Sequence, residues 1–107
     1  MAGPSQPPVD WRRLAEAVPG GVGVQRGETL SYVSPTFAGV VGRERQELLD
    51  SPWRTLFEST EAERIAAALE VARMEGRWTG ATWMVGAGRV PVELALSAAD
   101  GAVVWGI

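Results

Sequence analysis

The last third of the chain alternates apolar and polar residues between tight turns, a pattern that restricts it to antiparallel strands. The alternation is clearest in residues 89–98, where every second residue is apolar: Val90, Val92, Leu94 and Leu96. Gly86-Ala87-Gly88 separates this strand from one predicted over 77–85, and Asp100-Gly101 separates it from a last strand over 102–107. Pro91 favours a position where the backbone nitrogen has no strand partner, or a β-bulge.

The middle of the chain predicts three short helical elements followed by one long helix. Ser34 and Pro35 are typical of a helix start, and Gly42 is typical of a helix end. A second helix over 44–49 and a single turn over 53–57 follow. Thr60 and Glu63 have the spacing of a capping box for a long helix that ends at Gly76. Its predicted buried residues are Ala62, Ile65, Ala66, Leu69 and Ala72.

The first third begins with a proline-rich segment over 1–8, which we expect to be a flexible lead-in. Asp10 precedes a predicted helix over 10–18, whose apolar residues share one face. A hairpin then joins predicted strands over 21–25 and 29–34 through Gly27. The domain is therefore expected to span 9–107.

The composition limits the chemistry of the chain. It contains no Cys, His, Lys or Asn, which removes thiolate nucleophiles, imidazole bases, Schiff-base lysines and zinc sites built on Cys or His. We therefore expect a protein that is not an enzyme and holds no metal. The net charge is −3 without a basic stripe, so nucleic acid is a poor partner. No apolar run reaches the length of a membrane span and no signal peptide is present, which predicts a cytoplasmic protein.

Six segments, in this order, resemble motifs of the PAS family. They are 14–22 (LAEAVPGGV), 30–37 (LSYVSPTF), 42–49 (GRERQELL), 76–80 (GRWTG), 92–97 (VELALS) and the turn Asp100-Gly101. The resemblance covers residues 9–107. The chain departs from the family at Ser34, where Asn is frequent, and at Asp50-Ser51, where Gly is usual.

The resemblance implies an α+β fold: a five-stranded antiparallel sheet, with short helices and one long helix on one face and the N-terminal helix outside. It also implies a sensory or regulatory module within a larger signal-transduction protein, such as a histidine kinase or a transcription regulator. Such modules bind a small ligand or mediate protein contacts and dimerisation. The lack of Cys excludes the cysteinyl-flavin adduct, and the lack of His excludes the usual haem ligand, whereas noncovalent flavin or a small organic ligand stays possible.

Two groups of residues are candidate sites under this resemblance. A ligand cavity would be lined by apolar residues with a few polar groups: Tyr32, Phe37, Leu48, Trp53, Leu56, Phe57, Ile65, Leu69, Thr82, Val92, Leu94 and Leu96. A homodimer would use the apolar face of the N-terminal helix: Trp11, Leu14, Ala15 and Val18. Trp83 and Trp105 are expected to add apolar surface to the outer face of the sheet.

Two alternatives remain open on the sequence alone. One is a structural dimerisation domain whose core is filled and holds no ligand. The other is a small α+β enzyme with a carboxylate base in the cavity, for which Glu93 is the nearest candidate.

Overall fold

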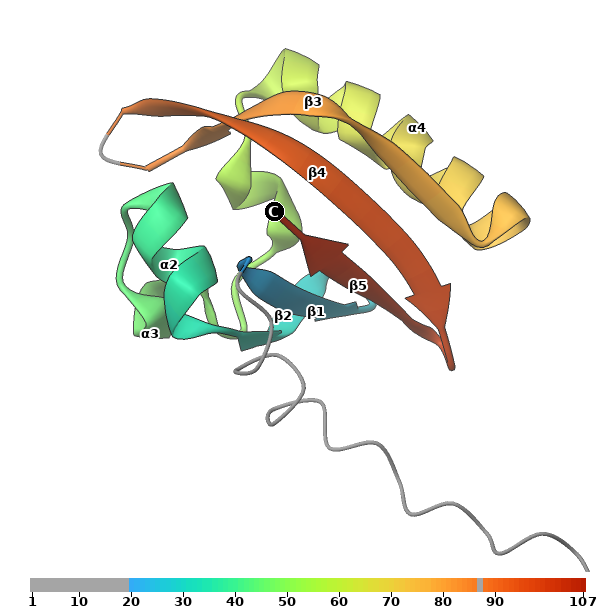
Figure 1. Ribbon diagram of the computed structural model, residues 1–107, viewed down its shortest axis with the longest axis horizontal. Helices are drawn as coiled ribbons and strands as arrows, with labels where there is room; N and C mark the ends of the chain where they lie inside the picture. The colour runs from blue at the N-terminus through green and yellow to red at the C-terminus, as the bar shows by residue number, and fades with distance from the viewer. Residues whose placement is uncertain (1–19, 87) are drawn as a thin grey trace, which may run out of the picture.

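One antiparallel sheet of five strands organises the computed structural model, which describes residues 20–86 and 88–107 (Figure 1). The strands are β1 (Val22–Arg26), β2 (Thr29–Val33), β3 (Arg77–Val85), β4 (Arg89–Ala99) and β5 (Ala102–Gly106). They lie in the order β2-β1-β5-β4-β3, so the last strand of the sequence occupies the centre. The helical elements are α2 (Pro35–Val41), α3 (Arg45–Leu48), η1 (Trp53–Leu56) and α4 (Ser59–Glu75).

The predicted α+β architecture is confirmed, since all five strands and the four helical elements of the described residues occur where the sequence placed them. The turn at Asp100-Gly101 has positive φ angles of 47° and 76°, which suits Gly and is tolerated by Asp. Pro91 pairs with Trp83 of β3, whereas β5 pairs with β4 only along Ala95 to Ala99. The ring nitrogen of Pro91 therefore costs the sheet no hydrogen bond on the β5 side. The predicted helix over 10–18 lies outside the described residues.

Helix α2 begins and ends as its sequence predicts. The Ser34 hydroxyl accepts a hydrogen bond of 3.1 Å from the backbone N–H of Phe37, and Pro35 occupies the first turn. Gly42 ends the helix in the left-handed conformation, with a φ of 79°. Asp50 also adopts a positive φ, 61°, at the position where the PAS pattern has Gly.

The start of α4 differs from the prediction. The helix begins at Ser59 with Glu58 as its N-cap residue, so Thr60 lies inside the first turn and forms no capping box. The Glu58 carboxylate instead accepts hydrogen bonds of 2.7 and 3.0 Å from Nε and Nη2 of Arg89. The predicted end at Gly76 is correct. The buried face contains Ala68, whereas the predicted Ala66 is half-buried.

The core lies between the helices and one face of the sheet. On β4 the predicted alternation is confirmed, because Val92, Leu94 and Leu96 are buried while Pro91 and Glu93 are exposed. The prediction for Trp105 was wrong: it is completely buried and belongs to the core cluster. Its register opposite Leu96 places it on the core face. Within residues 20–86 and 88–107, no helix has both the length and the hydropathy needed to cross a bilayer.

Candidate functional site

The residues predicted to line a ligand cavity are brought together by the fold. Ten of them belong to the single buried core cluster between the helices and the sheet: Phe37, Leu48, Trp53, Leu56, Phe57, Ile65, Leu69, Val92, Leu94 and Leu96. Thr82 is also buried, with 3% of its surface exposed. The short helices, α4 and β4 thus converge on one interior region.

Three aromatic rings pack against one another in this interior. The ring centroid of Trp53 lies 6.1 Å from that of Phe57 and 6.0 Å from that of Trp105. The rings of Phe57 and Trp105 are 5.9 Å apart. These separations are typical of favourable aromatic contacts. The indole rings therefore fill interior volume on the core face of the sheet.

Tyr32 and Glu93 lie on the other face of the sheet, contrary to their predicted roles. Tyr32 pairs with Val24, and the register then skips Ser31, so that Leu30 can return to the core face. Glu93 pairs with Ala81 and is exposed. Neither side chain faces the interior, so Tyr32 does not line it and Glu93 does not supply a cavity base.

A buried polar pair that the sequence did not reveal closes one end of the interior. Nε1 of Trp105 donates a hydrogen bond of 2.9 Å to Oε1 of Gln25, and Nε2 of Gln25 donates one of 2.8 Å to the Gly27 carbonyl. Gln25 is only 1% exposed. The apolar side chains of β1, Val22 and Val24, alternate with Gly23 and Gln25. This alternation places Gln25 on the face opposite the two valines and gives no sign that its amide is buried.

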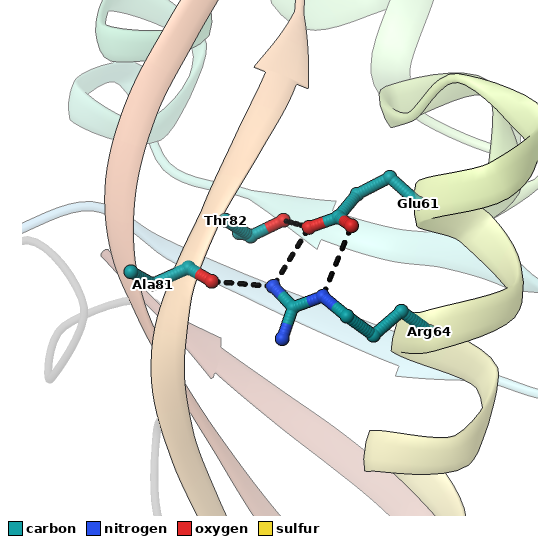
Figure 2. A network of polar contacts seen from close by, with 4 residues as sticks. All are labelled: Glu61, Arg64, Ala81 and Thr82. Carbon is teal, nitrogen blue, oxygen red and sulfur yellow. Dashed lines mark hydrogen bonds and ion pairs between the residues drawn. The ribbon is translucent and has the colours of Figure 1, made fainter.

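A polar network fastens α4 to strand β3 (Figure 2). Arg64 donates to both carboxylate oxygens of Glu61, at 3.0 and 2.7 Å, and to the Ala81 carbonyl. The Thr82 hydroxyl donates to Glu61 as well. The hydrogen bonds from Arg64 hold the pKa of Glu61 below its ordinary value of 4.5, against the opposing effect of burial. The same pair raises the pKa of Arg64.

The network occupies an edge of the sheet, because β3 is its last strand. Beside it, the guanidinium of Arg64 lies 6.0 Å from the Trp78 ring, and that ring covers Gly80, where an added Cβ would lie 2.7 Å from it. In the sequence, only the i, i+3 spacing of Glu61 and Arg64 on a helix indicates that these two residues can form an ion pair. That spacing does not show that Ala81 and Thr82 of β3 are their further partners.

The outer face of the sheet carries one large exposed aromatic side chain among the described residues. Trp83 is 54% exposed and lies opposite Pro91 on the neighbouring strand. Its flanking residues on the same face are Ala81 and Val85, as predicted. Because Trp83 faces away from the core, it is not available to a ligand in the interior.

A broad cleft of about 900 Å³ opens between α2, α3 and the β3–β4 turn. It contains Arg43, Arg45, Glu44 and Glu47 beside small residues. Arg43 Nε lies 3.9 Å from a carboxylate oxygen of Glu47, and Arg45 donates to the Val33 carbonyl. Its charged groups are therefore of both signs and partly engaged with the protein itself.

Comparison with known proteins identifies the fold. No family model and no curated protein matches the chain. Among solved structures, it is similar to the PAS domain, in complex with ethanol, of a LuxR-family transcriptional regulator from Burkholderia thailandensis. The two share 20% identity and a TM-score of 0.77, over 92% of this chain and 95% of the other.

Two further structures support the same assignment. A PAS domain from Colwellia psychrerythraea has 15% identity and a TM-score of 0.77, over 89% of this chain and 90% of the other. A domain of a sensory box sensor histidine kinase/response regulator from Geobacter sulfurreducens has 24% identity and a TM-score of 0.63, and the match covers 90% of this chain and 88% of the other. The chain has the PAS fold.

Proposed function

We propose that this chain is a regulatory PAS module without catalytic activity. It transmits a signal within a larger protein through contacts between two copies. The observation that carries the proposal is the exposed Trp83 on the outer face of the sheet, opposite Pro91. An indole in this position loses unfavourable contact with water when a partner covers it. The similar structures from a transcriptional regulator and a histidine kinase support the regulatory role.

The proposed occupant of the outer face is the N-terminal segment of a second copy. Trp11, Leu14, Ala15 and Val18 are spaced to form one apolar face, and a helix of about nine residues is too short to persist alone in water. Strand β1 begins at Val22, shortly after this segment, and lies three strands away from β3. At the usual spacing of strands, β1 and β3 are therefore about 14 Å apart. A helix that lies along a strand covers a width of only about 10 Å. One helix over β1 would leave Trp83 uncovered, and the partner's helix would cover it.

Sedimentation analysis of three chains tests this proposal at tens of micromolar. The intact chain is expected to be a dimer, and a chain that lacks residues 1–18 a monomer. Trp83→Ser is expected to weaken the dimer without unfolding the domain, because the side chain is exposed. Met74→Ser is the matched control, since Met74 is exposed on α4 rather than on the sheet. A monomeric intact chain, or a truncated chain that still dimerises fully, would overturn the proposal.

A small apolar ligand in the interior is the second candidate function. It is favoured by the convergence of the ten core residues and Thr82 on one region, and by the ethanol complex of the similar Burkholderia domain. The aromatic packing of Trp53, Phe57 and Trp105 favours the alternative of a filled core. Native mass spectrometry of the purified chain distinguishes them, since a bound ligand adds a defined mass and a filled core adds none. The same spectrum reports the number of subunits.

A further inference from the structure

A second cleft, separate from the core, opens at the end of the sheet that carries the β4–β5 turn. It has a volume of about 330 Å³ and is bordered by residues 98–103, by Gly27 of the β1–β2 turn and by Arg73 near the end of α4. Several of its lining residues are Gly or Ala, which leave space rather than filling it. None of the predicted cavity residues lines it.

Three side chains with different chemistry line this cleft: Gln25, Arg73 and Asp100. Gln25 is 1% exposed and uses one of the two amide hydrogens on Nε2 toward the Gly27 carbonyl. A side-chain amide can donate twice and accept twice, so this buried group retains capacity for a further hydrogen bond. A buried amide that completes its hydrogen bonds with a ligand gains more than an exposed one, because the local dielectric is low.

The two charged residues of the cleft have opposite signs. Among the described residues, Arg73 makes one ion pair: its Nη1 donates to a Glu70 carboxylate oxygen at 3.2 Å. A guanidinium has five N–H donors. The guanidinium of Arg73 is the preferred partner for a carboxylate. Asp100 lies in the turn between β4 and β5, where its carboxylate can accept a hydrogen bond from an ammonium group. A ligand that matches this set carries both charges on one small skeleton.

We infer that the cleft binds a small zwitterion of the free α-amino acid class. Arg73 binds the carboxylate, Asp100 binds the ammonium group, and the Gln25 amide forms a hydrogen bond with a further polar atom of the ligand. The cleft is large enough to admit an amino acid with a small side chain, whose apolar part contacts Ala98 and Val103, which pair with each other across β4 and β5. This site is independent of the dimer proposed above, and its failure would leave that proposal untouched.

Trp105 supplies the reporter for this site, because its Nε1–H donates to the same Gln25 amide. The chain has five tryptophans, so the indole N–H region of a ¹⁵N-¹H spectrum is sparse, and the spectrum of Trp105→Phe identifies the signal. Glycine, L-alanine and L-serine are added separately to the intact chain at millimolar concentrations. A saturable shift of the Trp105 signal is expected with at least one of them.

Two variants and a matched control test the roles of the charges. Arg73→Gln and Asp100→Asn are each expected to raise the apparent Kd about tenfold, the loss of one charge-assisted contact. Asn is chosen at position 100 because it tolerates the positive φ of 47°. Arg54→Gln is the control: Arg54 is 46% exposed in an ion pair of 3.3 Å, close to the 44% and 3.2 Å of Arg73.

The titrations of the parent chain and the three variants have outcomes that support the site or exclude it. Saturable shifts that weaken in the Arg73 and Asp100 variants, and not in the Arg54 variant, support the site. The absence of a saturable shift with all three amino acids would overturn it. Equal affinity for acetate or methylammonium, which each carry only one of the charges, would overturn the assignment to a zwitterion.

Discussion

The indole Nε1–H of Trp105 donates a hydrogen bond of 2.9 Å to Oε1 of Gln25, a residue 80 positions earlier in the chain. Both side chains are almost completely buried, and they belong to the neighbouring strands β5 and β1. Because Gln25 also bonds to the Gly27 carbonyl, the indole is connected to the β1–β2 turn. The position of the aromatic group in the core is therefore fixed by a polar contact as well as by packing.

Replacement of this indole is expected to destabilise the domain. Trp105→Phe removes the donor and leaves the Oε1 atom of Gln25 without its partner, at a cost of about 1–3 kcal/mol in the free energy of unfolding. Lost packing adds to this cost. Met74→Leu is the control, since the Met74 side chain is 83% exposed on α4 and the substitution is expected to change the free energy of unfolding by less than about 0.5 kcal/mol. Urea denaturation measures both, and equal effects would contradict the role of the buried hydrogen bond.

The network at α4 is expected to give a measurable dependence of stability on pH. Arg64 lowers the pKa of Glu61 in the folded state from its ordinary value of 4.5. The stabilisation by Glu61 is therefore present above that pH and is lost as the pH falls through the folded pKa. Glu61→Gln is expected to reduce the free energy of unfolding by about 1 kcal/mol near neutral pH. The variant should also lose less stability than the parent chain when the pH falls below about 4.

Glu63→Gln is the control for this measurement. Glu63 is 77% exposed and pairs with Arg54 at 3.3 Å, a contact that solvent screens. It is expected to leave the free energy of unfolding near neutral pH almost unchanged. Denaturation by urea at a series of pH values provides the comparison, and identical pH profiles for the parent and Glu61→Gln chains would contradict the assignment.

Two glycines flanking Ala87 are expected to respond differently to the same substitution. A Cβ added at Gly86 would lie 1.7 Å from the Val41 carbonyl oxygen, so Gly86→Ala must move the turn away from α2. A Cβ at Gly88 meets nothing within 4 Å. Gly86→Ala is expected to cost about 1–3 kcal/mol, the range found when atoms are forced into packed regions. Thermal denaturation compares it with Gly88→Ala, and similar melting temperatures for the two variants would refute the close approach.

The absorption spectrum of the purified chain tests the cofactor expectations. With no Cys and no His in the sequence, we expect no Soret band and no chromophore that survives denaturation. A flavin, if present, is expected to be released by denaturant because it would be held without a covalent bond. A visible band that remains with the denatured chain would contradict this prediction.

The elements of the described residues could be predicted from local signals. Ser34, Pro35 and Gly42 mark both ends of α2 by effects confined to a few residues. The alternation in β4 identified its buried face, because polar and apolar residues occupy opposite sides of that strand. Phe37 of α2 and Val92, Leu94 and Leu96 of β4 follow from these two kinds of signal. The other predicted interior residues were the apolar positions left after the turns and caps were assigned, and the resemblance to PAS domains brought them together.

The errors came from segments where the local signal is ambiguous. Strand β5 reads Ala102-Val103-Val104-Trp105, apolar at every position, so parity could not assign Trp105 to a face. Tyr32 was misplaced because the register between β1 and β2 skips Ser31, and an extra residue reverses the alternation beyond it. The first turn of α4 was misjudged because Thr60 and Glu63 have the spacing of a capping box, whereas the helix already begins at Ser59. The errors at Trp105 and Tyr32 both depend on how strands pair, which local spacing does not reveal.

The central position of β5 determines the order in which this sheet can be completed (Figure 1). The hairpin of β1 and β2 and the hairpin of β3 and β4 each form from neighbouring residues, but within the sheet they are joined only through β5. During synthesis from the N-terminus, both hairpins therefore wait with unpaired inner edges until residues 102–106 have left the ribosome. Unpaired strand edges of this kind attract other strands, so the interval before β5 inserts is when a nascent chain most needs protection from aggregation.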